Sequence, residues 1–326
     1  MKRISMILLV LCMLVGLLAC GKDKNSTTAS STTTSGQIPA GPGATTTTTM
    51  PEPTGASAIP YNSQLLIGKF SKFDQKGEQS VYQGEIVFSD SGVSTRGSGI
   101  QVSGNVATIV QSGSYRVSGT CNNGQLIVAV DKLDQVHIVL NGLTLKCSSS
   151  APFWVKSADK VTVTLAAGSQ NSFEDGTTYG TSTDAPKACV YGKDSLSFNG
   201  TGSLTVVSHV NNGIASSNDL KFLGGTYHVT AVNNAIKGND SIAILSANMT
   251  VISSDDAFKS DTLGETNKGC IYIQGGTFTV TAADDCFQAS TAIDLQGGTF
   301  YLTCGGRSVN CDGTVNKTTD AVIVNQ

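Results

Sequence analysis

The sequence has few charged residues and lacks any cluster of basic ones. Only 14% of its 326 residues are charged, and 24 acidic residues outnumber 21 lysines and arginines. Nucleic-acid-binding domains usually carry a basic patch, so this composition argues against a nucleic-acid partner. The chain has only three histidines, and none of its nine cysteines forms a CxxC pair with zinc-type spacing, which argues against a zinc site.

Helical periodicity and long apolar runs are also missing beyond the N-terminus. Residues 4–19 are almost entirely apolar, but no later apolar run is long enough to span a bilayer. The other apolar residues alternate with polar ones in short runs, and Gly-Gly and Asn-Asp pairs separate these runs as turns. The sequence therefore predicts an all-β fold.

The first 60 residues predict an export and anchoring segment rather than a folded domain. A basic start and the apolar run make residues 1–19 a signal peptide, and its end, LLAC, looks like the lipobox of bacterial lipoproteins. We therefore expect Cys20 to carry lipid, with an ordinary signal peptide and a chance cysteine as the alternative. Residues 20–60 form a Ser/Thr/Pro-rich tether, and residues 61–326 form the folded domain. This arrangement predicts an exported protein, anchored by lipid to a membrane of the bacterial cell envelope.

Seven cysteines follow Cys20, and export would permit disulfides among them. Because seven is an odd number, at least one stays unpaired within the chain. Cys189 and Cys286 each precede an apolar position in repeat-like segments, so we expect them to be buried as small apolar residues. The pairings left open are Cys121 with Cys147 and Cys304 with Cys311.

A repeat of about 22 residues organises the second half of the chain. The segments NNGIA, NNAIK, DDAFK and DDCFQ follow one another at offsets of 22, 22 and 29 residues, the last one longer by seven, and GGT recurs among the copies. Several short strands in a unit of this length make one coil of a right-handed parallel β-helix. Weaker copies from about residue 85 onward give roughly ten coils at this period. A β-propeller is the alternative, but its units are about 40 residues or longer.

The polar pair that opens each copy changes from two amides to two carboxylates. Adjacent coils lie ~4.8 Å apart, so equivalent side chains stack in columns. Stacked amides can hydrogen-bond to one another, whereas each pair of stacked carboxylates costs roughly 3 kcal/mol at an effective dielectric of 20. A cation is needed to offset this repulsion. The pairs are Asn211–Asn212, Asn233–Asn234, Asp255–Asp256 and Asp284–Asp285.

Calcium is the cation that this spacing favours. Its oxygen ligands lie at ~2.3–2.6 Å, so two oxygens across one ion are separated by about one coil spacing, whereas magnesium requires a tighter octahedron. Glu265 and Asn267, in the insertion after the first acidic pair, could add ligands. The alternative is that one aspartate of each pair faces water and Lys259 neutralises the other. The predicted ligands are Asp255, Asp256, Asp284, Asp285 and Asp261.

Three segments resemble a family of secreted bacterial carbohydrate-binding proteins. They are GSYRVSGTCNNGQLIVAV, VHIVLNGLTLKCSSSAPFWVKSADKVTVTLAAGSQNSFEDG and the repeats around DDAFKSD and DDCFQAS, and the likeness spans about residues 85–315. The resemblance implies a right-handed parallel β-helix similar in fold to pectate lyases. It also implies binding of calcium and of acidic plant polysaccharides such as polygalacturonate. By position it assigns the family's acidic turn pairs to the four aspartates at 255, 256, 284 and 285. The amides at 233 and 234 depart from that pattern, and so does the C-terminal segment, where Asp312 is left as the candidate for a last ligand.

These observations favour a protein that binds an acidic polysaccharide without cleaving it. Lys237 and Lys259 occupy the same position of adjacent repeats, where they either contact uronates or are solvated surface lysines. Trp154, the single tryptophan, either stacks on a sugar ring or packs in the core.

Two other functions remain open. A polysaccharide lyase of this fold needs an arginine or lysine base beside the metal. The chain after the signal peptide has only Arg96, Arg116 and Arg307, and only Arg307 comes one coil after an acidic pair. The other alternative is that the protein is a structural surface protein or an adhesin.

Overall fold

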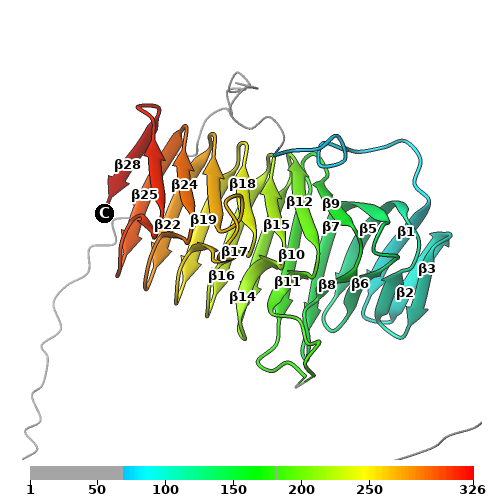
Figure 1. Cartoon of the computed structure of the whole chain (residues 1–326). Helices are drawn as coiled ribbons and strands as arrows, with labels where there is room; N and C mark the ends of the chain where they lie inside the picture. The colour runs from blue at the N-terminus through cyan, green and yellow to red at the C-terminus, as the bar shows by residue number, and fades with distance from the viewer. Residues whose placement is uncertain (1–68, 181) are drawn as a thin grey trace, which may run out of the picture. The chain divides into compact units, whose positions relative to one another are not determined.

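The computed structural model describes residues 69–180 and 182–326, which form β-strands and turns (Figure 1). These residues contain no α-helix, and hence none that could cross a membrane. The predicted signal peptide, the lipidation residue Cys20 and the tether lie outside the described residues.

The strands form three faces of a solenoid, here named the first, second and third face. The first face contains β7 (Gln135–Cys147), β9 (Lys160–Leu165), β12 (Ser195–Gly200), β15 (Asp219–Phe222), β18 (Ser241–Ile244), β21 (Cys270–Ile273), β24 (Ala292–Leu295) and β27 (Thr314–Lys317). The second contains β10 (Gln170–Asp175), β13 (Ser203–Ser208), β16 (Thr226–Ala231), β19 (Asn248–Ser253), β22 (Thr277–Ala282), β25 (Gly298–Cys304) and β28 (Ala321–Asn325). Beside both halves of β7 lies the long strand β5 (Gly113–Cys121), which pairs in turn with β1 (Gly84–Ser89), and β1 pairs with β2 (Gly92–Gly97). The third contains β3 (Ile100–Ser103), β4 (Val106–Ile109), β6 (Gln125–Ala129), β8 (Phe153–Ser157), β11 (Ala188–Gly192), β14 (Asn212–Ser216), β17 (Ile236–Gly238), β20 (Phe258–Ser260), β23 (Phe287–Ala289) and β26 (Asn310–Cys311).

The strand pairing confirms the predicted parallel β-helix. On the third face Ala215 pairs with Lys237, Lys237 with Lys259, Lys259 with Gln288, and Gln288 with Asn310, which reproduces the offsets of 22, 22, 29 and 22 residues. Every pairing in the described residues is parallel except two hairpins near the start, β1–β2 and β3–β4. The long strand β7 pairs with β9 by its first half and with β10 by its second, so it joins the first and second faces into one 18-stranded sheet.

The core fills the space between the three faces with one apolar column per inward position. Phenylalanines of successive coils stack, with ring centroids 4.7 Å apart for Phe258 and Phe287 and 4.8 Å for Phe278 and Phe300, about the spacing between strands. Val280 of β22 also faces this core, with only 1% of its surface exposed. Cys189 and Cys286 are fully buried, as expected, but all seven cysteines of the described residues are free, so neither pairing left open by the sequence is formed.

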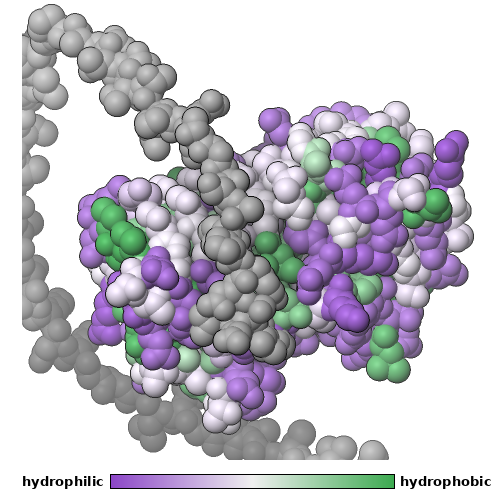
Figure 2. All heavy atoms as spheres, turned by 90° about the horizontal axis from the view of Figure 1, so that it is seen from above, coloured by the Kyte–Doolittle hydropathy of each residue, from purple (hydrophilic) through white to green (hydrophobic). Residues whose placement is uncertain are grey.

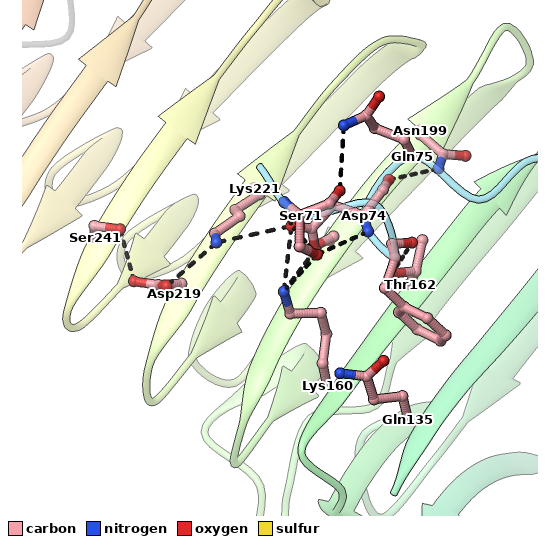
Figure 3. A network of polar contacts seen from close by, with 12 residues as sticks. Ser71, Asp74, Gln75, Gln135, Lys160, Thr162, Asn199, Asp219, Lys221 and Ser241 are labelled. Atoms are coloured by element: carbon pink, nitrogen blue, oxygen red, sulfur yellow. Dashed lines mark hydrogen bonds and ion pairs between the residues drawn. The ribbon is translucent and has the colours of Figure 1, made fainter. Parts of the chain in front are cut away.

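A segment before the first strand crosses the outer side of the first face. This strap, residues 69–78, places Asp74 against strands β9, β12 and β15 (Figure 3). The Asp74 carboxylate is fully buried, accepts a 2.6 Å hydrogen bond from Ser197 Oγ and lies 3.0 Å from Lys160 Nζ. Burial alone would raise the pKa of Asp74, but hydrogen bonds from Ser197 and Ser71 and the charges of the nearby lysines hold it below its usual value.

The surface offers no broad apolar patch on the side seen in Figure 2. Hydrophilic and intermediate residues cover most of that view, and the hydrophobic ones form small separate areas. A polar ligand therefore fits this side better than an apolar partner surface does.

Candidate functional site

The polar pairs lie in the turns that lead from the second face into the third. In the first two copies they form the amide ladder expected from the sequence. Asn233 Nδ2 donates to Asn211 Oδ1 at 2.9 Å, and Asn234 Nδ2 donates to Asn212 Oδ1 at 3.0 Å. Asn234 Nδ2 also donates to Asn233 Oδ1 at 3.1 Å. These contacts explain the amides without any ligand.

The ladder breaks where amides give way to carboxylates. Asn234 is 4% exposed, and its Oδ1 is a buried acceptor without a hydrogen-bond partner. The next residue in this column is Asp256, whose ionised carboxylate has no hydrogen to donate. A buried acceptor left unpaired is costly, so this boundary favours a proton donor or a cation.

Three carboxylates converge at this boundary. One oxygen each from Asp255, Asp256 and Asp284 lies within 4.8 Å of the others. That spacing suits calcium, whose ligand oxygens lie ~2.3–2.6 Å from the ion. Asp256 is 2% exposed, and burial raises its pKa, although hydrogen bonds from Lys259 and from the Asp285 backbone act in the opposite direction. The group of Asp255, Asp256 and Asp284 is named the carboxylate group below.

The side chain of Asp285 lies outside the carboxylate group. Its Oδ1 accepts the backbone N–H of Arg307 at 2.7 Å, and its Oδ2 accepts Asn310 Nδ2 at 2.5 Å. Its own backbone N–H donates to Asp256 Oδ1 at 3.0 Å. Asp285 therefore links three successive coils and orients one oxygen of Asp256.

The insertion after β20 lies away from the carboxylate group. Asp261 Oδ2 is 2.6 Å from Lys237 Nζ, and Glu265 is 2.9 Å from Lys268. Asn267 lines a hollow beside the strap, on the first face. The reason is the direction of the chain: β20 carries it across the third face, so residues before and after this strand emerge at opposite edges. Of the five predicted ligands, the structure thus brings together Asp255, Asp256 and Asp284, and leaves the side chains of Asp261 and Asp285 outside this group.

Lys259 makes the contact that the alternative interpretation anticipated. Its Nζ lies 2.7 Å from Asp256 Oδ2, and its side chain is 21% exposed. Burial lowers the pKa of Lys259, but the hydrogen bond and charge of Asp256, with the charges of Asp255 and Asp261, outweigh it and raise that pKa. The register also pairs Lys237 directly with Lys259, which confirms that they occupy one position of adjacent coils.

An outward column on the third face connects these lysines to two aromatic residues. Trp154 pairs with Tyr191, Tyr191 with Ala215, and Ala215 with Lys237, which pairs with Lys259. Trp154 is partly buried and packs against a small hydrophobic cluster that includes Tyr191 and is separate from the main core. Tyr191 was not singled out from the sequence, although its offset from the repeat slot could have indicated it.

The surroundings of Trp154 leave it one free polar atom. Lys156 Nζ lies 4.2 Å from the centroid of its ring, a cation–π contact. Its Nε1 is buried and has no hydrogen-bond partner. Tyr191 is only 5% exposed, and its hydroxyl hydrogen-bonds to Ser217 Oγ at 2.9 Å. Its ring therefore packs against its neighbours in the column and exposes little surface on which a sugar ring could stack.

Arg307 is the arginine that lies beside the acidic turns. Its backbone contacts Asp285, while its guanidinium Nη1 donates to Asn310 Oδ1 at 2.8 Å. Arg116 lies in β5 and Arg96 in β2, near the opposite end of the solenoid in Figure 1.

Comparisons with known proteins agree with this architecture. A family model described as carbohydrate-binding domain-containing protein matches residues 103–324. A carbohydrate-binding domain-containing protein of Acetivibrio thermocellus is 36% identical over 221 residues, which cover 67% of this chain and 77% of that protein. A solved structure, the gadolinium derivative of a polysaccharide lyase-like protein from C. thermocellum, superposes with a TM-score of 0.72 at 34% identity and covers 74% of this chain and 100% of its own. The parallel β-helix and these matches together establish that the chain belongs to the carbohydrate-binding domain-containing protein family.

Proposed function

We propose that this protein binds an acidic polysaccharide without cleaving it, in a calcium-dependent manner, at the bacterial cell surface. Family membership supports carbohydrate binding in general. The acidic class of the ligand, the calcium ion and the lipid anchor at Cys20 are the parts that the residues of this chain lead us to add.

The carboxylate group is the observation that carries the proposal. Asp255, Asp256 and Asp284 each offer an oxygen at a spacing that fits calcium, and the orphaned Asn234 Oδ1 lies at the same boundary. When bound, calcium would supply positive charge and open coordination positions for ligand oxygens. The related solved structure is a gadolinium derivative, and gadolinium is a hard cation like calcium.

The charge of the chain explains why a cation would be needed. The sequence has a formal net charge of −3, so an acidic polymer meets net repulsion unless a cation lies between them. Calcium held by the carboxylate group would bridge protein and uronate carboxylates. Lys237 and Lys259, on the outward column of the third face, would add contacts to the same polymer.

The test is retention of polygalacturonate by the protein with calcium and with a chelator. We expect binding in calcium, its loss in chelator, and no binding of a neutral glucan under either condition. Equal retention of the acidic polymer with and without calcium would refute the calcium dependence. Preference for the neutral glucan would refute the ligand class.

A polysaccharide lyase is the second candidate, favoured by the lyase-like relative and by Arg307 beside the acidic turns. A lyase would release unsaturated products that absorb ultraviolet light. We expect no such products from polygalacturonate in calcium, because the Arg307 guanidinium is engaged with Asn310 rather than facing the carboxylate group. Accumulation of these products, and its loss on Arg307→Ala substitution, would establish the enzyme instead.

A further inference from the structure

Lys259 is held between the carboxylate group and the outward column of the third face. Its ammonium lies 2.7 Å from Asp256 Oδ2. Lys237 is its direct neighbour across β17 and β20, but the ammonium of Lys237 lies 2.6 Å from Asp261, which follows β20 at the opposite edge of the face. The two lysines thus share one outward position, while their charged ends contact different carboxylates.

Both oxygens of Asp256 are engaged in these contacts. Oδ1 accepts the Asp285 backbone N–H at 3.0 Å, and Oδ2 accepts Lys259 Nζ. A calcium ion coordinated by Asp256 would compete with the Lys259 ammonium, because two cations at one carboxylate repel each other. The Asp285 N–H belongs to the backbone and cannot move by itself, whereas the Lys259 ammonium is at the end of a flexible four-carbon side chain. Lys259 is therefore the group that yields.

The Lys259 contact is also an incomplete substitute for a bound cation. It leaves Asn234 Oδ1, in a residue that is 4% exposed, without a hydrogen-bond partner in the described structure. It contacts one member of the carboxylate group, whereas an ion at the centre of the three oxygens could contact all of them. The site is thus neutralised in part, at the one carboxylate that is most buried.

We propose that Lys259 is a latch that couples calcium binding to polysaccharide binding. Without calcium it neutralises Asp256; with calcium its ammonium moves onto the outer side of β20, beside Lys237. This inference rests on the proposed function and adds how the two ligands communicate. In the displaced position the two lysines stand on strands ~4.8 Å apart, where their ammonium groups can hydrogen-bond to the carboxylates of one polyuronate chain.

The latch makes calcium and the acidic polymer cooperative. Calcium exposes the Lys259 charge to the polymer, and the polymer in turn holds Lys259 away from Asp256. By linkage, each ligand raises the affinity for the other by the same factor.

The first arm of the test is calorimetric titration of the protein with calcium alone. Lys259→Met should bind calcium about tenfold more tightly than the wild type, equivalent to about 1.4 kcal/mol, because the competing ammonium is gone. Lys259→Arg keeps the charge and should remain near the wild type. Lys237→Met is the matched control: its partner Asp261 lies outside the carboxylate group, so its calcium affinity should not change.

The second arm measures polygalacturonate affinity with and without calcium. Both Met variants should bind the polymer more weakly in calcium, but only Lys259→Met should lose most of the factor by which calcium improves binding. Thermal melts in chelator check folding, and Lys259→Gln, which keeps a donor for Asp256, replaces the Met variant if that variant does not fold.

The outcomes separate the latch from the function on which it rests. If the wild type binds calcium but Lys259→Met binds it equally or more weakly, the latch is wrong and the proposed function stands. If the wild type binds no calcium, the calcium dependence fails, and the latch fails with it.

Discussion

At the scale of single residues, one column of side chains changes its chemistry between two coils. Asn234 donates one amide hydrogen bond to Asn212 Oδ1, and Asp256 then takes the next position without a donor for Asn234 Oδ1. The backbone geometry is continuous across this boundary, since Lys237 and Lys259 pair in register. The change is therefore a property of side chains alone, which makes it accessible to conservative substitution.

Asp256→Asn should restore the amide ladder and remove the response to calcium. The raised pKa of Asp256 means that its ionised form is less favourable in the folded than in the unfolded chain, so a permanently neutral amide should stabilise the protein. Its Nδ2 can also donate to Asn234 Oδ1, which adds about 1 kcal/mol and offsets loss of the Lys259 ion pair. Thermal melts should show a higher Tm than the wild type in chelator and no further rise in calcium. Asp261→Asn is the control and should keep the calcium response; a full response in Asp256→Asn would contradict the site.

His137 predicts loss of stability in weak acid. It is fully buried, and burial lowers its pKa to about 4 from the usual 6.5. Thr164 Oγ1 donates to the Lys76 carbonyl and so accepts from His137 Nε2, which leaves Nδ1 to accept from Ser114. The folded state thus holds the neutral ring, while the unfolded state takes up a proton below pH 6.5. Stability should fall as the pH drops from about 6.5 to about 4, by at most about 3 kcal/mol.

Urea unfolding across this pH range measures the effect. His137→Gln cannot be protonated, so its stability should depend less on pH in this window, whatever its stability at neutral pH. The same slope in both proteins would assign the acid sensitivity to other groups.

At the scale of elements, the strap is the part that the sequence did not reveal. It has few apolar residues, and it makes its contacts with partners far along the chain, such as the 3.2 Å hydrogen bond from Lys160 to Asp74, 86 residues apart. Local patterns carry no signal of such pairings. The hairpins β1–β2 and β3–β4 also escaped prediction, because their alternation resembles that of the parallel strands.

The regular coils, in contrast, could be predicted because each repeats the same alternation of apolar and polar residues along its strands. The 22-residue offset fixed the columns, including Lys237 beside Lys259 and the stacked polar pairs. The offset could not say which member of each pair turns inward, since that depends on the turn. Hence Asp284 joins the carboxylate group while Asp285 bonds to Arg307 and Asn310.

Asp74→Asn tests how much the strap stabilises the solenoid. It leaves Lys160, which is 13% exposed, without its charged partner, and breaking a buried ion pair in this way costs about 3–5 kcal/mol. Chemical denaturation should show a loss of that order. The matched control is Asp184→Asn, which removes an exposed partner of Lys193 and should cost much less, because water screens an exposed ion pair. Similar losses in both variants would mean that the strap contributes little.

At the scale of the whole molecule, we propose separate tasks for the folded domain and for the N-terminal segment. The β-helix presents long, flat faces that suit a polymer, and the proposed anchor holds them near a membrane. Residues 20–60 are rich in Ser, Thr and Pro, a composition that predicts a tether able to span a variable distance. If the proposed anchor is correct, the position of the protein in the envelope should depend on Cys20 and not on the coils.

Cys20→Ser should release the protein from membranes without changing its fold. The basic start, the apolar run and the LLAC sequence predict cleavage before Cys20 and lipid on its sulfur, and several acyl chains anchor far better than one. Membrane fractionation should find the wild type in the membrane pellet and the variant outside it, while thermal melts of the two agree. A control substitution at Cys12, inside the apolar run and away from the predicted cleavage site, should leave the protein in the membrane fraction. A wild type that is soluble and still carries residues 1–19 would overturn both the anchor and the proposed location, yet it would leave calcium and polysaccharide binding by the coils to be judged separately.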